Sequence, residues 1–209
     1  MTEDVFYKAL EERHGKENQE KLKRGVVGIA GLGGLGSNVA YSLARLGVGK
    51  LILVDFDRVD ITNLNRQQYF AEDLGSYKTE ALARGLIRVN PFGQYLTRTE
   101  RVTPENVKSL FGKCHILVEA FDRPEEKAML VEQALVQLPG IPLITGSGMA
   151  GYGSANEIHT RKTMGRVYIC GDGVSDLSEG LELMAPRVAV CAAHEATMVL
   201  RILLGEMEP

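Results

Sequence analysis

A glycine-rich stretch constrains the fold of this chain more than any other feature. Val26–Ala30 predicts a buried strand, and residues 31–36, which read GLGGLG, follow it directly. From there to Gly47, apolar residues recur at helical spacing and predict a helix. Glycines between a strand and a helix let the backbone turn sharply and approach a phosphate, which the helix N-terminus attracts. The stretch predicts a nucleotide-binding loop. Because it also satisfies the G-x-G-x-x-G pattern of dinucleotide-binding proteins, it leaves the nucleotide open.

Composition and charge exclude several classes of protein. With 209 residues, 44% of them hydrophobic, the chain is long and apolar enough for one globular domain with a sizeable core. A net charge of −3 gives no reason to expect a nucleic-acid partner, and no apolar run has the length of a membrane span. The N-terminus lacks the basic start and apolar middle of a signal peptide, so we expect a cytoplasmic location.

The chain contains three cysteines, which are few and far apart. Cys114, Cys170 and Cys191 are an odd number at wide spacing, so they indicate neither a disulfide framework nor a complete zinc site. We expect each of them to be a small buried hydrophobic residue rather than a reactive thiol.

The first twenty-four residues differ in character from the rest of the chain. They are highly charged, and Phe6, Leu10 and Arg13 share one helical face before Gly15 interrupts the pattern. We therefore predict an N-terminal helical segment, residues 1–24, followed by a single domain, residues 25–209. For Arg13 the simplest interpretation is a surface arginine whose stem lies on the apolar side of the helix.

Strands and helices alternate along most of the remaining sequence. Apolar runs predict strands at residues 50–55, 94–99, 115–120, 141–145, 154–160 and 166–170, and helical periodicity predicts helices at residues 78–89, 104–111, 125–138 and 186–204. The alternation indicates a doubly wound, Rossmann-like α/β fold with a mainly parallel sheet and helices on both faces. No helix separates the last two predicted strands, which favours an antiparallel extension, and residues 171–180 predict a polar loop.

Acidic residues follow two of the predicted strands. Asp55 comes about 20 residues after the glycines, where an acid can hold ribose hydroxyls, and Asp122 follows strand 115–120. The carboxyl ends of parallel strands line one crevice, so both acids are expected there. Asp122 has a second interpretation as the N-cap of the helix that begins at Arg123-Pro124.

A polar segment and a lysine extend this pattern. Asp57, Asn63, Arg66 and Gln67 lie in a stretch without core periodicity, and these residue types suit a polyphosphate and its metal, although a solvated loop is the simpler interpretation. Lys78 stands in the first turn of its predicted helix, where its charge opposes the helix dipole. A bound anion would reverse the sign of that effect, so we expect Lys78 to bind phosphate.

Taken together, these motifs resemble the ThiF/MoeB family, relatives of the ubiquitin-activating enzymes, and in particular a short ThiF-like branch. The resemblance covers about residues 26–148. The residues that carry it are Gly31, Gly33, Gly34, Gly36, Ser37, Asp55, Asp57, Asn63, Asn65, Arg66, Gln67, Lys78 and Asp122. It implies a homodimer that uses ATP to adenylate the C-terminal glycine carboxylate of a ubiquitin-like sulfur carrier protein ending in Gly-Gly. The ThiF branch acts on ThiS-like carriers of the thiamine biosynthesis type.

The resemblance also implies roles for individual residues. Asp55 would bind the ribose, and Asp57 and Asp122 would bind magnesium. Asn63, Arg66 and Lys78 would bind the phosphates. Gln67 would lie beside them in the nucleotide site. Arg13 matches only loosely a family arginine that crosses from the second subunit. A carboxylate is already deprotonated at neutral pH, so the reaction requires positioning and charge neutralisation rather than a general base.

The sequence departs from longer family members in its cysteines. Their two CxxC pairs hold a structural zinc, whereas here Gly173 stands where Cys170 would need its pair, so we predict no zinc. Residues 171–185 contain no cysteine that could carry the activated carrier, and Cys191 is a poor substitute. Adenylation would then be the whole chemistry of this chain, with sulfur delivered by another protein.

Three other functions fit parts of the sequence. The glycine loop permits an NAD-dependent oxidoreductase, although Arg66, Lys78 and Asp122 argue against one. A tRNA threonylcarbamoyladenosine dehydratase-like enzyme shares the fold and the use of ATP, but this composition does not indicate the basic surface that tRNA would require. A carrier-binding module with a nucleotide pocket but no turnover is the non-enzymatic alternative.

Overall fold

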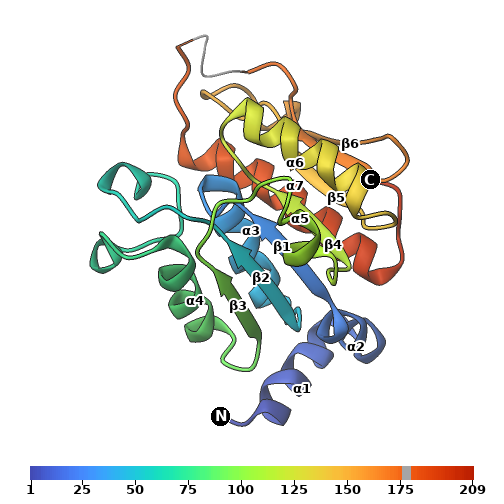
Figure 1. Cartoon of the computed structure of the whole chain (residues 1–209). Helices are drawn as coiled ribbons and strands as arrows, with labels where there is room; N and C mark the ends of the chain where they lie inside the picture. Colours follow the sequence, from blue (N-terminus) through green and yellow to red (C-terminus); the bar gives the residue numbers. More distant parts are fainter. Residues whose placement is uncertain (176–179) are drawn as a thin grey trace.

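A seven-stranded sheet forms the centre of the computed structural model, which describes residues 1–175 and 180–209. The strand order is β3-β2-β1-β4-β5-β7-β6 (Figure 1). The strands are β1 (Val26–Ala30), β2 (Lys50–Val54), β3 (Gln94–Arg98), β4 (Ile116–Glu119), β5 (Leu143–Gly146), β6 (His159–Thr163) and β7 (Val167–Gly171). Neighbouring strands pair in parallel except β6 and β7, which are antiparallel. The predicted mainly parallel α/β fold with an antiparallel end is confirmed.

Helices cover both faces of the sheet. The helices are α1 (Glu3–His14), α2 (Lys16–Arg24), α3 (Gly34–Arg45), α4 (Lys78–Val89), α5 (Val107–Phe111), α6 (Pro124–Gln137) and α7 (Ala185–Leu204). Buried residues of α3, α4 and α7 share one apolar cluster with β1 and β2, while those of α5 and α6 share a second cluster with β4 and β5. The two clusters lie on opposite faces because successive side chains of a strand alternate in direction.

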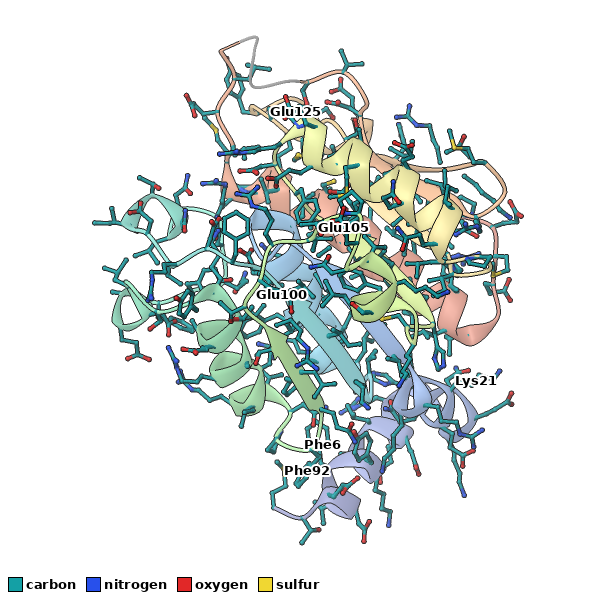
Figure 2. The ribbon with its side chains drawn as sticks, viewed as in Figure 1. Phe6, Lys21, Phe92, Glu100, Glu105 and Glu125 are labelled. Atoms are coloured by element: carbon teal, nitrogen blue, oxygen red, sulfur yellow. The ribbon has the colours of Figure 1, made fainter. Side chains whose placement is uncertain are left out.

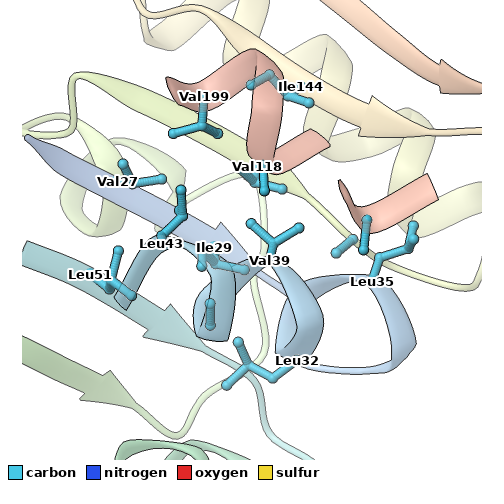
Figure 3. Packing of buried hydrophobic residues seen from close by; sticks show 14 of the residues in the cluster. Val27, Ile29, Leu32, Leu35, Val39, Leu43, Leu51, Val118, Ile144 and Val199 are labelled. Carbon is cyan, nitrogen blue, oxygen red and sulfur yellow. The ribbon is translucent and has the colours of Figure 1, made fainter. Parts of the chain in front are cut away.

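The β1 strand illustrates how the sequence fills these layers. Val27 and Ile29 are fully buried and belong to the cluster with α3 and α7, where Val39 and Val199 pack (Figure 3). Between them, Gly28 faces α5. A Cβ at Gly28 would lie 2.7 Å from the Phe111 ring, so glycine lets this helix pack directly on the backbone.

The N-terminal helices lie at the amino ends of the strands. α1 and α2 meet at Gly15, whose φ of +84° interrupts the helix as predicted. The Phe6 ring contacts that of Phe92, just before β3, with centroids 5.6 Å apart (Figure 2). The Gln19 amide donates to the carbonyl of Leu46, before β2. The segment is therefore packed against the end of the sheet that lies away from the glycine loop.

One predicted strand is wrong in its first half. Residues 154–158 are not extended: Ser154 accepts a hydrogen bond from the Asn156 amide and starts a 3₁₀ turn, Ala155–Glu157, so β6 begins only at His159. A local side-chain bond of this kind competes with strand formation. Two further 3₁₀ turns, Ile61–Asn63 and Ala71–Asp73, lie between β2 and α4. Residues 176–179 of the predicted polar loop lie outside the described part of the chain.

Candidate nucleotide site

A cavity of about 560 Å³ opens at the carboxyl ends of the parallel strands. The chain runs outward from β1 to β2 on one side and to β4 on the other, so the cavity lies at the point where the strand order reverses, the usual ligand position in such sheets. Nine of the predicted site residues line it: Gly31, Gly33, Gly34, Asp55, Asp57, Arg66, Gln67, Lys78 and Asp122. The structure thus brings together most of the predicted site.

Glycine is required at different positions of the loop for different structural reasons. Gly31 has a φ of +88°, a conformation that side chains disfavour. A Cβ at Gly36 would lie 1.9 Å from the carbonyl oxygen of Gly31, so α3 can follow the turn closely only with glycine there. A Cβ at Gly33 would meet nothing nearer than 3.8 Å. Gly33 lines the cavity and leaves room for a ligand.

Asp55 fixes the glycine loop to the end of β2. Its carboxylate accepts hydrogen bonds from the Leu32 amide at 2.7 Å and from the Asp57 amide at 2.8 Å. Burial raises the pKa of Asp55, while the nearby Lys78 ammonium and the two amides act in the opposite direction. Each carboxylate oxygen keeps a further lone pair, so the residue can also accept from a ribose hydroxyl.

Lys78 and Asp57 form an ion pair on the wall of the cavity. The ammonium nitrogen lies 3.0 Å from the Asp57 carboxylate, and the side chain of Lys78 is 8% exposed against 49% for Asp57. The Lys78 amide also donates to the Asp57 carbonyl, which fixes the start of α4. The pair holds a positive charge at one place in the wall while its acid stays open to solvent.

Two polar atoms in the same wall lack a partner. The Arg66 guanidinium donates to the Thr62 carbonyl at 3.2 Å and to the Asn65 side chain at 2.8 Å, but its Nε is buried without a hydrogen bond among the described residues. The side-chain amide oxygen of Gln67 is likewise buried and has no hydrogen bond among the described residues. Buried polar atoms are normally satisfied, so this wall fits a ligand that carries both donors and acceptors.

Three predicted site residues do not line the cavity. Gly36 packs against the carbonyl of Gly31, as described above. The side chain of Asn63 accepts from the Asp60 amide at 3.0 Å and closes the turn Ile61–Asn63. Arg13 is exposed on α1, at the amino ends of the strands, and thus faces away from the cavity of its own chain.

Asp122 is exposed at the end of β4, and its second interpretation is wrong. Arg123 occupies the N-cap position of α6 and no side chain caps the helix, with Pro124 as its first residue. Asp122 is therefore not used in capping. With Asp57 it places two carboxylates on the cavity, which suits a Mg²⁺ ion that completes its coordination with ligand phosphates and water. No group of three or more His, Cys, Asp or Glu residues able to hold a metal occurs in residues 1–175 and 180–209.

An aromatic surface at the cavity was not predicted. Phe56 is 39% exposed, and the Arg101 guanidinium lies 4.2 Å from its ring centroid while pairing with Glu126. All three residues line the cavity. Stacked aromatic and guanidinium planes of this kind can bind the face of a purine base. Their sequence signal is weak because it depends on contact between β2, β3 and α6.

A buried charge network on the other side of the cavity was also missed. Glu119 is fully buried, and its carboxylate accepts from the Phe121 amide at 2.7 Å, from the Lys127 ammonium at 2.5 Å and from the Thr145 hydroxyl. Lys127 also lies 3.3 Å from the Thr145 oxygen. A glutamate that ends the apolar run of β4 was the available signal, since a buried acid requires a partner.

A second cavity, of about 600 Å³, adjoins the first. Ala150 and Ser175 line both of them. In the second, Arg187 is 5% exposed, pairs with Asp172 and donates to the Ser154 carbonyl at 2.8 Å. Burial alone would raise the pKa of Asp172, but hydrogen bonds from two backbone amides and from Arg187 lower it to about 2.

The three cysteines are buried, as predicted, and their thiols are free. Burial raises the pKa of Cys114 and of Cys170 to about 12, and it raises that of Cys191 further. Their thiols are therefore protonated at neutral pH and inaccessible, which makes them poor nucleophiles. None of the helices in residues 1–175 and 180–209 has the length and apolarity required to cross a bilayer.

The fold and the cavity define a nucleotide-binding α/β domain of the Rossmann type. Residues 7–209 match the model of the ThiF family, and the chain belongs to that family. The predicted resemblance is thereby confirmed.

Relatives of known name differ in what they act on. The chain is 33% identical over 207 residues to a sulfur carrier protein adenylyltransferase of Thermus thermophilus, covering 93% of this chain and 75% of that protein. It is 36% identical over 138 residues to a tRNA threonylcarbamoyladenosine dehydratase of Bacillus subtilis, covering 65% and 54%. It spans 33% of the length of fungal relatives named adenylyltransferase and sulfurtransferase uba4.

Among solved structures, the E. coli tRNA N6-threonylcarbamoyladenosine dehydratase in complex with ATP superposes with a TM-score of 0.85. That alignment covers 95% of this chain and 93% of the other at 22% identity. At this identity the similarity establishes the fold alone.

Proposed function

We propose that this chain is a cytoplasmic, ATP-dependent adenylyltransferase that activates the C-terminal glycine carboxylate of a ubiquitin-like, ThiS-like sulfur carrier protein. The observation that carries the proposal is the shared cavity of the glycine loop, Asp55 and the Lys78–Asp57 pair. This arrangement offers backbone amides, a ribose acceptor and a fixed positive charge to a nucleoside triphosphate. The Thermus relative, matched over nearly the whole chain, supports the choice of acceptor.

The residues divide the chemistry between them. Asp55 binds the ribose, and the Phe56–Arg101 surface binds the base. Lys78 and Arg66 neutralise charge on the phosphates, which is the main requirement when a carboxylate attacks phosphorus. Asp57 and Asp122 would hold magnesium, which supplies further neutralisation of the departing pyrophosphate. Zinc has no part in the proposal.

Arg13 enters the proposal through a second copy of the chain. Arg13 is exposed, and within residues 1–175 and 180–209 its side chain forms no hydrogen bond or ion pair. We propose a homodimer in which the N-terminal segment, residues 1–24, carries Arg13 toward the partner's nucleotide. A charge supplied from a second subunit in this way is worth about 10³-fold or more in related phosphoryl transfers.

A tRNA threonylcarbamoyladenosine dehydratase-like function is the second candidate. It is favoured by the Bacillus relative, which matches 65% of this chain. The two candidates share the use of ATP and differ in whether the acceptor is a protein or a tRNA. An NAD-dependent oxidoreductase and a carrier-binding module without turnover remain as outcomes of the tests.

The acceptor experiment separates these functions. Purified protein with ATP and magnesium is mixed with individual carrier proteins ending in Gly-Gly or with tRNA bearing threonylcarbamoyladenosine, and pyrophosphate release is measured. Release that requires one carrier supports the proposal, and release only with tRNA supports the dehydratase. Tight carrier binding without release indicates a binding module. Binding of NADH but not ATP, measured by fluorescence, would identify an oxidoreductase.

A further inference from the structure

Two lysines of the nucleotide cavity are anchored in similar ways on opposite sides of β1. Lys78 pairs with Asp57 beyond the end of β2, and Lys127 pairs with Glu119 at the end of β4. Both line the cavity, and both belong to the first turns of helices that follow these strands. The proposed function uses Lys78 for phosphate and gives Lys127 no role.

The ammonium of Lys127 has bonding capacity to spare. It carries three N–H donors, of which Glu119 accepts one and the Thr145 hydroxyl oxygen lies within reach of a second. No third bond from Lys127 is present in the part of the chain that the structure describes. The side chain is 26% exposed whereas Glu119 is fully buried, so the open side of the ammonium faces the cavity.

Glu119 connects Lys127 to the wall opposite the glycine loop. Its second oxygen accepts from the Phe121 amide, next to Asp122, and Thr145 leads directly into the Gly146–Gly148 turn, which also lines the cavity. Glu195 of α7 also lies close to this turn, since a Cβ at Gly146 would be 3.0 Å from its carboxylate oxygen. Burial raises the pKa of Glu195 to about 8, so at neutral pH this acid is mostly uncharged and does not cancel Lys127.

We propose that Lys127 binds the carboxylate of the acceptor, with Glu119 and Thr145 as its positioning residues. This rests on the proposed adenylation and names the chemical group recognised on the acceptor side. A carrier ends in a glycine carboxylate, and a threonylcarbamoyl group also carries one, so the same contact serves either acceptor. One carboxylate oxygen bonds to the α-phosphorus as the bond to pyrophosphate breaks, and Lys127 keeps its proton throughout.

The competing explanation is that Lys127 only neutralises Glu119. Lys127→Met alone does not separate the two, because it leaves a buried acid unpaired and lowers stability. The double variant Glu119→Gln with Lys127→Met removes both charges and leaves an acceptor for the Phe121 amide. It therefore restores stability but still lacks the ammonium. Lys162→Met is a matched control. Lys162 lies on β6, its side chain is 25% exposed, and its ammonium pairs with Glu208 at 2.6 Å.

The test uses the full chain with ATP and magnesium, and ¹³C-labelled glycylglycine as the carboxylate probe, with its binding measured by NMR titration. We expect Lys127→Met and the double variant to weaken glycylglycine binding at least about tenfold, as for the loss of a charged hydrogen bond. Lys127→Arg should remain within about threefold of wild type, and Lys162→Met should be unchanged. Thermal unfolding confirms that each variant is folded.

Two results would overturn the inference: wild-type affinity in the folded double variant, or no glycylglycine binding by the wild-type protein. Failure of the proposed function is a separate result. In that case pyrophosphate release is absent with every acceptor, whether or not glycylglycine binding depends on Lys127.

Discussion

The two sides of the nucleotide cavity are built from different materials. On the β1–β2 side, backbone groups form much of the wall, because the Leu32 and Asp57 amides donate to Asp55 and hold the glycine loop in place. The ion pair on this side, Lys78 with Asp57, has a half-exposed acid. On the β4–β5 side, a buried side-chain ion pair between Glu119 and Lys127 supports the wall, and a second pair, Arg187 with Asp172, lies in the adjoining cavity. Backbone amides do not change when residues are substituted, whereas side-chain pairs do. The difference suggests that the first side serves a feature common to all nucleotides and the second an acceptor that varies within the family.

The largest effect is expected from a substitution in the glycine loop, on the β1–β2 side of the cavity. Gly36→Ala would place a Cβ 1.9 Å from the Gly31 carbonyl oxygen, and we expect it to cost more than about 4 kcal/mol and to abolish ATP binding. Gly33→Ala, whose Cβ would meet nothing within 3.8 Å, is the matched control and should fold normally. Thermal unfolding with and without ATP measures both quantities. Equal stability of the two variants would contradict this account of the loop.

Lys78→Met tests whether a charge on the nucleotide side acts in chemistry rather than in folding. Asp57 is 49% exposed, so it tolerates the loss of its partner, and the stability in urea should change little. We expect pyrophosphate exchange to fall about 10²–10³-fold, the range for removing one fixed group that stabilises the transition state. An exchange rate within threefold of wild type would show that Lys78 serves only as the structural partner of Asp57.

In contrast to Lys78→Met, Arg187→Met should lower stability and leave nucleotide binding unchanged. The Arg187 and Asp172 side chains are 5% and 11% exposed, so the variant leaves a poorly solvated acid and should lose about 3 kcal/mol in urea unfolding. ATP affinity should stay within threefold of wild type, since Arg187 does not line the nucleotide cavity. A variant of normal stability with weakened ATP binding would reverse our division of the two sides.

The smallest expected effect concerns Glu195, whose carboxylate oxygens are buried and have no hydrogen-bond partner within residues 1–175 and 180–209. Burial raises its pKa to about 8 in the folded protein, whereas the unfolded chain releases the proton near its ordinary value of 4.5. Between these two values the folded state binds more protons, so this residue lowers stability as pH rises. Glu195→Gln should remove that decline, so its stability relative to wild type should increase steadily from pH 5 to pH 8. Urea midpoints at pH 5, 6.5 and 8 measure it, and parallel pH profiles would contradict it.

Local patterns in the sequence account for the parts of the structure that were predicted. The glycine loop and Asp55 depend on a strand, a turn and a helix that follow one another, and alternation of strands and helices predicted the parallel sheet. The wrong strand at residues 154–158 arose because one hydrogen bond to Ser154 outweighs a weak strand pattern. The Glu119–Lys127–Thr145 network could not be predicted because it depends on how β4, β5 and α6 pack together.

The most direct test of the account is ATP–pyrophosphate exchange by the wild-type protein and by Asp122→Ala, each with and without a carrier protein ending in Gly-Gly. Asp122 is exposed and caps no helix, so its loss should leave the fold intact. We predict carrier-dependent exchange in the wild type that disappears in the variant, while both proteins bind ATP. Carrier-dependent exchange that survives in Asp122→Ala would contradict the proposed site, and exchange by neither protein with any carrier would contradict adenylation of a carrier.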